Sequence, residues 1–327
     1  MKSRTFGRTG RSVGEIGLGT WQIGGNWGDV TEQDAFATLR SAVEQGVNFF
    51  DTADVYGEGR SETIIGKFLK ETRAPIFIAT KLGRFPNPGW PKNFTREAVR
   101  QHTEASLKRL GIEALDLTQL HCIPEDILRR GEMFTWLEEL RREGKIKAYG
   151  ASVESMEQGL WCIEHGGSSA LQIIFNIFRQ KPIEQLFARA KEKNVALIIR
   201  LPLASGLLSG RMTKETKFSA DDHRNFNRDG QAFNVGETFA GLPFEKGVEL
   251  ADQLKSFVPA GQTFAEFAIR WCLDYDAVSV VIPGARNPEQ VRANLRPTSQ
   301  PPLSADVHNR LADFYRDKVA AYIRGPY

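Results

Sequence analysis

Short apolar runs alternate along the chain with longer segments in which apolar residues recur at helical spacing. Within each run the apolar residues are consecutive, which is typical of parallel strands that are covered on both faces. We expect eight such strands, at residues 16–20, 47–50, 76–80, 115–120, 146–150, 170–175, 195–200 and 278–283.

The segments between these runs predict helices. Thr31, with Asp34 three residues later, has the form of a helix N-cap, and Ser304 is a second candidate cap. The expected helices cover residues 31–46, 61–71, 95–111, 133–144, 155–166, 183–194, 244–257, 263–276, 288–295 and 304–323.

Eight strands, most of them separated by a helix, predict a closed (β/α)₈ barrel, which is an α/β fold. Residues 3–16 contain Gly-Arg-Thr-Gly and predict a β-hairpin ahead of the first strand. The competing fold, a doubly wound dinucleotide-binding sheet, needs the fingerprint G-x-G-x-x-G. Gly17 and Gly19 are present, but Gln22 stands at the third position, which weakens that alternative. We expect residues 1–327 to form one barrel domain with extra C-terminal helices.

The composition excludes several classes of protein. Hydrophobic residues make up 41% and charged residues 25% of the 327 residues, as in ordinary globular proteins. The net charge is +3 without a dense basic cluster, so neither nucleic acid nor a membrane is the expected partner. Three scattered cysteines predict neither a disulfide framework nor a metal site. We find no signal peptide or membrane span and expect a cytoplasmic protein, whose oligomeric state the sequence leaves open.

Polar residues follow the apolar runs at the strand ends, where a barrel carries its chemistry. Asp51 ends the second expected strand and Tyr56 follows it, while Lys81 and His121 come directly after the third and fourth. The later strands carry Ser152, Gln172, Asn176 and Arg200 at or near their ends. Each such residue taken alone is commonly a turn residue or a solvated charge. Together on neighbouring strands, they indicate one shared polar site.

These residue types suit the reduction of a carbonyl group. A free tyrosine has a pKa of about 10, and a buried lysine beside it would favour the phenolate and lower that pKa. The lysine in turn needs a counterion, which Asp51 can supply to Lys81. His121 can donate a hydrogen bond to a substrate oxygen. No side chain donates hydride, so a nicotinamide or flavin cofactor is required.

The sequence closely resembles the aldo-keto reductases over essentially its whole length, including bacterial members and relatives among potassium channel beta subunits. The segments GLGTW, NFFDTADVYGEGRSE, IATK, SLKRLGIEALDLTQLH, PLASGLLSG and VIPGARNPEQVRANL match family segments and occur in the family's order. The resemblance implies a (β/α)₈ barrel plugged by the N-terminal hairpin. It also implies NADPH as the cofactor and a small-molecule carbonyl compound as the substrate.

The resemblance also assigns roles by position. It implies Tyr56 as the proton donor, Lys81 and Asp51 as the groups that tune it, and His121 as the group that orients the carbonyl. Ser152 and Gln172 would hold the nicotinamide carboxamide, and Arg286 would meet the 2′-phosphate. The complete implied cofactor site comprises Gly19, Thr20, Trp21, Ser152, Gln172, Arg200, Leu201, Pro202, Leu203, Ser205, Gly206, Leu207, Arg211, Gly284, Ala285, Arg286, Gln290 and Asn294.

Four positions depart from the family pattern. Arg200 stands where an aromatic residue usually lies under the nicotinamide, Val153 replaces a common Asn, Arg211 a frequent Lys, and Ala293 a frequent acid. Arg200 can stack on the ring, which would favour NADPH over the cationic NADP⁺, or it can pair with an acid.

The leading interpretation is an NADPH-dependent reductase of aldehydes or ketones. Two alternatives stay open: a sugar or polyol dehydrogenase that uses the same site in reverse, and a slow accessory subunit that binds NADPH. The loop 83–94 carries Phe85 and Trp90 and is expected to wall the substrate pocket. The irregular stretch 203–240 is too long for a plain connection, so it is either functional or mobile.

Overall fold

A closed barrel of parallel strands forms the centre of the molecule. The computed structural model describes residues 1–25 and 30–327. In this part of the chain, eight parallel strands are hydrogen-bonded in chain order. They are β3 (Leu18–Gly19), β4 (Phe49–Asp51), β5 (Phe77–Leu82), β6 (Leu117–His121), β7 (Tyr149–Ser152), β8 (Ala170–Ile174), β9 (Ala196–Arg200) and β10 (Val278–Val281). Parallel bridges from Ile16 to Val281 and from Gly19 to Gly284 join the first strand to the last, so the predicted barrel is confirmed.

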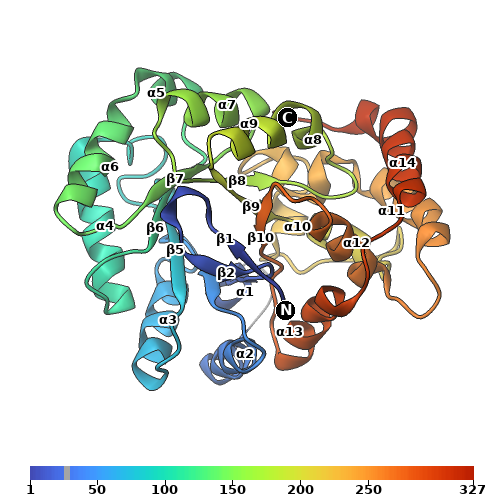
Figure 1. The fold of residues 1–327 in the computed structure, drawn as a ribbon, viewed down its shortest axis with the longest axis horizontal. Coiled ribbons are helices and arrows are strands. Elements are labelled where there is room, and N and C mark those ends of the chain that lie inside the picture. The colour runs from blue at the N-terminus through green and yellow to red at the C-terminus, as the bar shows by residue number, and fades with distance from the viewer. Residues whose placement is uncertain (26–29) are drawn as a thin grey trace.

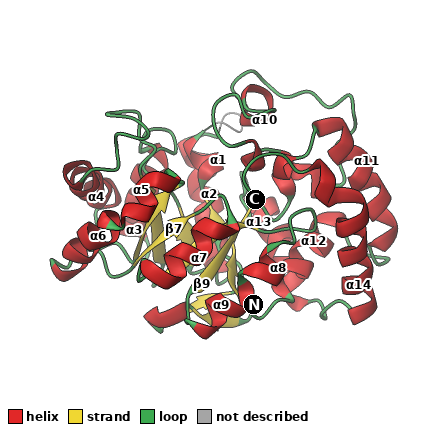
Figure 2. Cartoon of the chain, turned by 90° about the horizontal axis from the view of Figure 1, so that it is seen from above, coloured by secondary structure: helices red, strands yellow, loops and turns green. Residues whose placement is uncertain are grey.

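Helices surround the strands, as Figure 2 shows. Each predicted helix has a counterpart, and Thr31 and Ser304 cap their helices by accepting from the amides of Asp34 and Val307. The long helices are α2 (Glu32–Glu44), α3 (Arg60–Glu71), α4 (Arg96–Leu110), α6 (Glu132–Arg142), α7 (Met156–His165), α11 (Phe244–Leu254), α12 (Phe264–Leu273), α13 (Pro288–Leu295) and α14 (Ala305–Phe314). No helix of the described residues is long and apolar enough to cross a membrane.

The helix boundaries differ from the expectation in two places. The helix expected over 183–194 is split at Leu186 into α8 (Pro182–Gln185) and α9 (Phe187–Glu192). The helix expected over 304–323 is α-helical only to Phe314 and continues as a π-helix over Tyr315–Val319 and a 3₁₀ segment over Ala320–Tyr322. The sequence pattern did not reveal three short helices, α1 (Trp21–Gly24), α5 (Glu125–Arg130) and α10 (His223–Phe226), because four to six residues carry too little periodicity.

The N-terminal hairpin closes one end of the barrel. Its antiparallel strands, β1 (Ser3–Thr5) and β2 (Ser12–Gly14), lie in front of the sheet in Figure 1. Phe6, the residue directly after β1, is fully buried and packs against Phe49 and Phe77, with ring centroids 5.4 and 4.9 Å away. Gly7 approaches the barrel so closely that a Cβ there would lie 2.6 Å from the amide nitrogen of Ala196. The expected plug is therefore present.

Strand register places the polar strand ends at one level. Lys81 pairs with Gln119, His121 with Ser152, and Ser152 with Gln172 in successive strand pairs. The irregular stretch after β9 carries α10, which lies at the opposite end of the barrel from the N-terminus in Figure 2. The hairpin thus seals the bottom, and the polar strand ends face the open mouth.

Candidate active site

A chain of hydrogen bonds links an acid, a lysine and a tyrosine at the mouth of the barrel. The Lys81 ammonium donates to Asp51 Oδ2 at 2.6 Å, to the Thr52 carbonyl at 2.9 Å and to the Tyr56 hydroxyl at 3.2 Å. Asp51 and Lys81 are almost completely buried. Each charge stabilises the other, because a buried Asp51 carboxylate or Lys81 ammonium without a partner would be energetically unfavourable. The expected ion pair is therefore present, and it ends on the phenol.

Tyr56 keeps its proton at neutral pH. Burial raises the pKa of its phenol, and the opposing effect of the Lys81 charge is smaller. The expected lowering by Lys81 therefore exists, but the net pKa shift is upward because the phenolate would be desolvated. Burial also disfavours the Lys81 ammonium, yet Asp51 and Tyr56 favour it more, so the pKa of Lys81 lies above its usual value. The site thus holds a protonated phenol beside a fixed positive charge.

His121 and Trp21 flank the phenol. The Tyr56 and His121 rings meet edge to face with centroids 6.1 Å apart, and the Trp21 indole stacks on Tyr56 at 5.7 Å. Burial, reinforced by the positive charges of Arg84 and Lys81, puts the pKa of His121 well below its ordinary value. His121 is therefore a neutral imidazole, and its Nδ1 has no hydrogen-bond partner among the described residues.

The second oxygen of Asp51 is held by amides. Gln172 Nε2 donates to Asp51 Oδ1 at 2.7 Å, and Gln119 Nε2 donates to the same oxygen at 3.3 Å. Sequence reasoning did not single out Gln119, which is fully buried within β6. Because Gln172 uses its NH₂ group on Asp51, its carbonyl oxygen is the part that can accept from another group in the cavity.

A large cavity of about 1180 Å³ opens beside these residues. Of the catalytic residues expected from the sequence, Asp51, Tyr56 and His121 line it, while Lys81 lies behind Tyr56. The expected cofactor residues along its wall are Gly19, Thr20, Trp21, Ser152, Gln172, Arg200, Leu201, Pro202, Leu203, Ser205, Gly206, Arg211, Gly284, Arg286, Gln290 and Asn294. Leu207 and Ala285 instead lie in the hydrophobic core, so only their backbones could serve a ligand.

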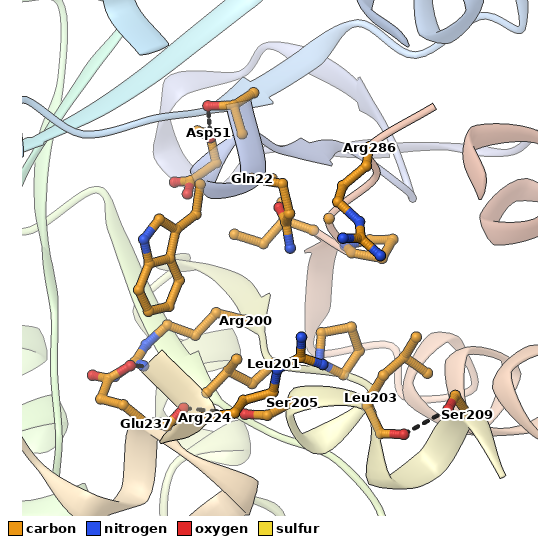
Figure 3. Close-up of a pocket in the computed structure, with 18 of the residues that line it drawn as sticks. Gln22, Asp51, Arg200, Leu201, Leu203, Ser205, Ser209, Arg224, Glu237 and Arg286 are labelled. Carbon is orange, nitrogen blue, oxygen red and sulfur yellow. Dashed lines mark hydrogen bonds and ion pairs between the residues drawn. The ribbon is translucent and has the colours of Figure 1, made fainter. Parts of the chain in front are cut away.

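The cavity runs between two walls, as Figure 3 shows. Asp51, Gln22 and Arg286 lie along one wall, and Arg200, Leu203 and Ser209 lie along the other. Gly284 is packed so closely under Gln22 that a Cβ there would lie 2.2 Å from its amide. Further along, the Arg286 amide donates to Gln290 Oε1 at 2.8 Å, and Asn294 Nδ2 donates to the Gly284 carbonyl at 3.1 Å. Residues 201–211 and 284–294, which the resemblance assigns to the cofactor, therefore line one groove.

The loop after β9 takes a backbone shape that few residues adopt. Leu201, Ala204 and Ser205 have positive φ angles of 54°, 48° and 56°, and Gly206 follows at 103°. The Ser205 hydroxyl does not point into the cavity; it contacts the Glu237 carbonyl and accepts from the Phe239 amide. Such strain persists only where the surroundings hold it, which makes this turn a candidate ligand contact.

Arg200 pairs with an acid. Its guanidinium donates to the Glu237 carboxylate and, at 3.2 Å, to the Val153 carbonyl, and both charged side chains are nearly buried. This is one of the two outcomes expected for Arg200. Because Glu237 neutralises its charge, the expected bias toward NADPH loses most of its basis.

Sequence reasoning missed a charged wall next to His121. Arg84, Glu154 and Glu237 all line the cavity, each from a loop beyond a different strand. Cys122 lies beneath them, and its sulfur and the two carboxylates converge within 4.8 Å, as they would around a metal ion. Each carboxylate has a guanidinium partner, since Arg84 contacts Glu154 and Arg200 contacts Glu237. The only sequence signal was the length of the stretch 203–240, which carries Glu237.

The comparison with protein families agrees with the geometry. The model described as "Aldo/keto reductase family" matches residues 15–316. The chain belongs to the aldo/keto reductase family. Members of this family of oxidoreductases bind nicotinamide cofactors. Its curated relatives include "Aldo-keto reductase YhdN" from Bacillus subtilis, 31% identical over 96% of both chains. They also include a "Probable voltage-gated potassium channel subunit beta" from Arabidopsis thaliana, 30% identical over 94% of both chains.

Solved structures of the family share the fold. The "aldo-keto reductase AKR11C1 from Bacillus halodurans (holo form)" superposes with a TM-score of 0.79, at 27% identity and 96% coverage of both chains. The "glycerol dehydrogenase AKR11B4 from Gluconobacter oxydans" has a TM-score of 0.76 at 29% identity, covering 97% of this chain and 94% of that one.

The residues of this aldo/keto reductase fit a nicotinamide dinucleotide. One end of the cavity offers the Ser152 hydroxyl and the Gln172 carbonyl, which suit a carboxamide. The other end carries the basic side chains of Arg211, Arg286 and Arg296, which suit phosphates.

Proposed function

We propose that this chain is an NADPH-dependent reductase that converts aldehydes or ketones to alcohols, with Tyr56 as the proton donor. The observation that carries the proposal is the buried chain from Asp51 through Lys81 to Tyr56, which ends in a large cavity. The relatives whose names describe reductases and dehydrogenases support the reaction class.

Each member of the site has a separate role. The cofactor, when bound, supplies hydride to the carbonyl carbon. Tyr56 gives its proton to the carbonyl oxygen as negative charge develops there. Lys81 stabilises the phenolate that remains, and Asp51 holds Lys81 in its charged form. Neutral His121 donates a hydrogen bond that orients the carbonyl.

The protonation state of the site favours reduction at neutral pH. Reduction needs a protonated Tyr56, and burial raises the pKa of that phenol. Oxidation of a polyol or sugar would start from the phenolate, which burial disfavours. We therefore expect reduction to be the main direction near pH 7 and oxidation to gain rate as the pH rises.

We propose NADPH rather than NADH because basic residues gather at the far end of the groove. Arg286 lies beside Gln290 at the position that the resemblance gives to the 2′-phosphate. Replacing Arg286 by Ala should weaken NADPH binding about tenfold or more and leave NADH binding within about twofold, since only NADPH carries the extra phosphate. Titration of nicotinamide fluorescence measures both affinities, and equal losses for the two cofactors would argue against this role.

We also infer that residues 1–327 form a single barrel domain. All three cysteines are free and buried, which suits the reducing conditions of a cytoplasm.

The proposal is tested by following NADPH oxidation with a panel of aldehydes, ketones and sugars, beside the same panel with NADH. Turnover of carbonyl compounds with NADPH is the expected result. Tight NADPH binding without turnover of any compound would favour the accessory-subunit alternative. Turnover only of polyols with NADP⁺ would favour the dehydrogenase alternative.

A further inference from the structure

Arg84 places hydrogen-bond donors next to the reacting groups. It lies two residues beyond β5 and lines the cavity together with Tyr56 and His121. Its side chain is 19% exposed, and its Nη2 contacts Glu154 Oε1 at 3.3 Å. Its Nε is buried and has no hydrogen-bond partner among the described residues. The positive charge of Arg84 also helps to lower the pKa of His121, so it acts on the same part of the cavity.

The Arg84 guanidinium has a hydrogen-bond donor that lacks an acceptor among the described residues. It has five N–H donors, and the hydrogen bond to Glu154 uses one of them. Leaving buried donors without acceptors is unfavourable, because their hydration has been lost. Arg84 can thus donate a further hydrogen bond to an oxygen atom of a molecule in the cavity.

The surrounding charges determine which kind of oxygen fits. Two guanidiniums, Arg84 and Arg200, face two carboxylates, Glu154 and Glu237, so the group is neutral overall. The carboxylates would repel an anionic substrate from the oxygen site at Arg84. A hydroxyl group is different, because it can accept from Arg84 and donate to Glu154 at the same time.

We propose that Arg84 and Glu154 together recognise a hydroxyl group near the substrate carbonyl, so that the preferred substrates are uncharged hydroxyaldehydes or hydroxyketones. This assignment rests on the proposed reductase function, whose carbonyl lies between Tyr56 and His121. The exposed face of Trp90, fixed by its Nε1 donating to the Cys122 carbonyl at 3.1 Å, supplies an apolar surface for the carbon chain. Arg84 and Glu154 are therefore specificity-determining residues and take no part in proton transfer.

The test compares three small aldehydes with NADPH: lactaldehyde, propanal, which lacks the hydroxyl, and glyoxylate, which carries a carboxylate instead. The variants are Arg84→Met and Glu154→Gln, and Arg96→Met is the control, because Arg96 forms an exposed ion pair with Glu139 far from the cavity. We expect wild type to prefer lactaldehyde over both other aldehydes. Arg84→Met should lower kcat/KM for lactaldehyde about 10- to 100-fold and for propanal less than about threefold.

The outcomes separate this assignment from the proposed function. An unchanged ratio of lactaldehyde to propanal in both variants would overturn the hydroxyl site, although the enzyme would still be a reductase. A wild-type preference for glyoxylate would also overturn the hydroxyl site, because Arg84 would then bind a carboxylate and not a hydroxyl group. If the wild type reduces none of the three while NADPH binds, the hydroxyl site is overturned. The wider panel of aldehydes, ketones and sugars then decides whether the reductase function fails as well.

Discussion

Asp54 occupies a buried position close to the hydrogen-bonded chain of Asp51, Lys81 and Tyr56, yet it forms no ion pair with these residues. It lies three residues beyond Asp51 and is fully buried, and His102 Nδ1 lies 3.9 Å from its Oδ2. Burial, followed by repulsion from Glu62, raises its pKa to about 8, although Arg109 opposes the shift. Asp54 is therefore uncharged at neutral pH, so Asp51 remains the main counterion of Lys81.

Asp54 should make stability depend on pH. In the unfolded chain an Asp releases its proton near pH 4, whereas the folded protein keeps the Asp54 proton until about pH 8. The folded state therefore loses stability as the pH rises through this window, by at most about 1.4 kcal/mol per pH unit. Asp54→Asn removes this loss, so the variant should gain stability over wild type between pH 5 and pH 8.

Urea unfolding at several pH values measures the difference, and exposed Asp126, which pairs with Arg130 on the surface, provides the control Asp126→Asn. A stability difference between Asp54→Asn and wild type that stays constant with pH would show that Asp54 is ionised in the folded protein.

The positions of some site residues were predictable from the sequence, and those of others were not. Asp51, Lys81 and His121 sit at the ends of neighbouring parallel strands, so the barrel alone brings them together. Arg84 and Glu237 come from loops, whose course depends on contacts between distant segments. The pKa of Tyr56 was also beyond sequence reasoning, because it depends on how completely the phenol is buried.

At the scale of elements, the segment 324–327 fixes the loop that carries Glu237. Arg324 donates to the carbonyls of Gly241 and Leu242 and pairs with Asp229 at 2.7 Å. The buried Arg179 guanidinium lies 4.1 Å from the Tyr327 ring centroid and donates to the Pro326 carbonyl. The loop over the cavity is thus supported from outside by a segment distant in sequence.

Removing the Tyr327 ring should loosen this loop. Tyr327→Ala removes the aromatic face above Arg179 and the hydrogen bond to the Tyr315 hydroxyl at 2.7 Å. We expect a loss of about 1–3 kcal/mol in stability and faster amide exchange over 227–242. Hydrogen-exchange mass spectrometry measures the effect. Tyr322→Ala is the control, because Tyr322 is exposed. Equal rates of amide exchange over 227–242 in the two variants would show that Tyr327 does not stabilise this loop.

Helices were predictable where they are long and amphipathic, as α2 and α4 are. The expected helix 304–323 is α-helical only to Phe314. Beyond it the chain stays helical but becomes a π-helix, in which the Tyr315 hydroxyl bonds that of Tyr327. The prediction of one continuous helix over 183–194 was wrong at Leu186, whose side chain is fully buried at the break between α8 and α9. In both cases tertiary contacts override the local pattern.

For the whole molecule, the closed barrel separates a sealed end from an open end. The interior core near the hairpin is apolar and includes Phe6, Phe49 and Phe77. The opposite end carries the polar strand ends and the cavity. The sequence predicted this division, because eight apolar runs with polar C-terminal ends have few other ways to be buried.

The plug should contribute strongly to stability. Phe6→Ala opens a cavity between the hairpin and the barrel floor and should cost about 3–5 kcal/mol. Thermal and urea unfolding measure the loss. Phe226→Ala is the matched control, because Phe226 is 36% exposed, and it should change stability by less than about 1 kcal/mol. Similar losses in the two variants would show that the hairpin does not seal the barrel.

The central claim is that Tyr56 donates the proton in carbonyl reduction, and Tyr56→Phe tests it most directly. The substitution keeps the ring against Trp21 and removes only the hydroxyl that Lys81 contacts. For an aldehyde that wild type reduces, kcat should fall by about 10²–10⁴-fold, while NADPH affinity measured by fluorescence stays within about threefold. A Tyr56→Phe enzyme that binds NADPH normally and reduces the aldehyde at the wild-type rate would contradict the account.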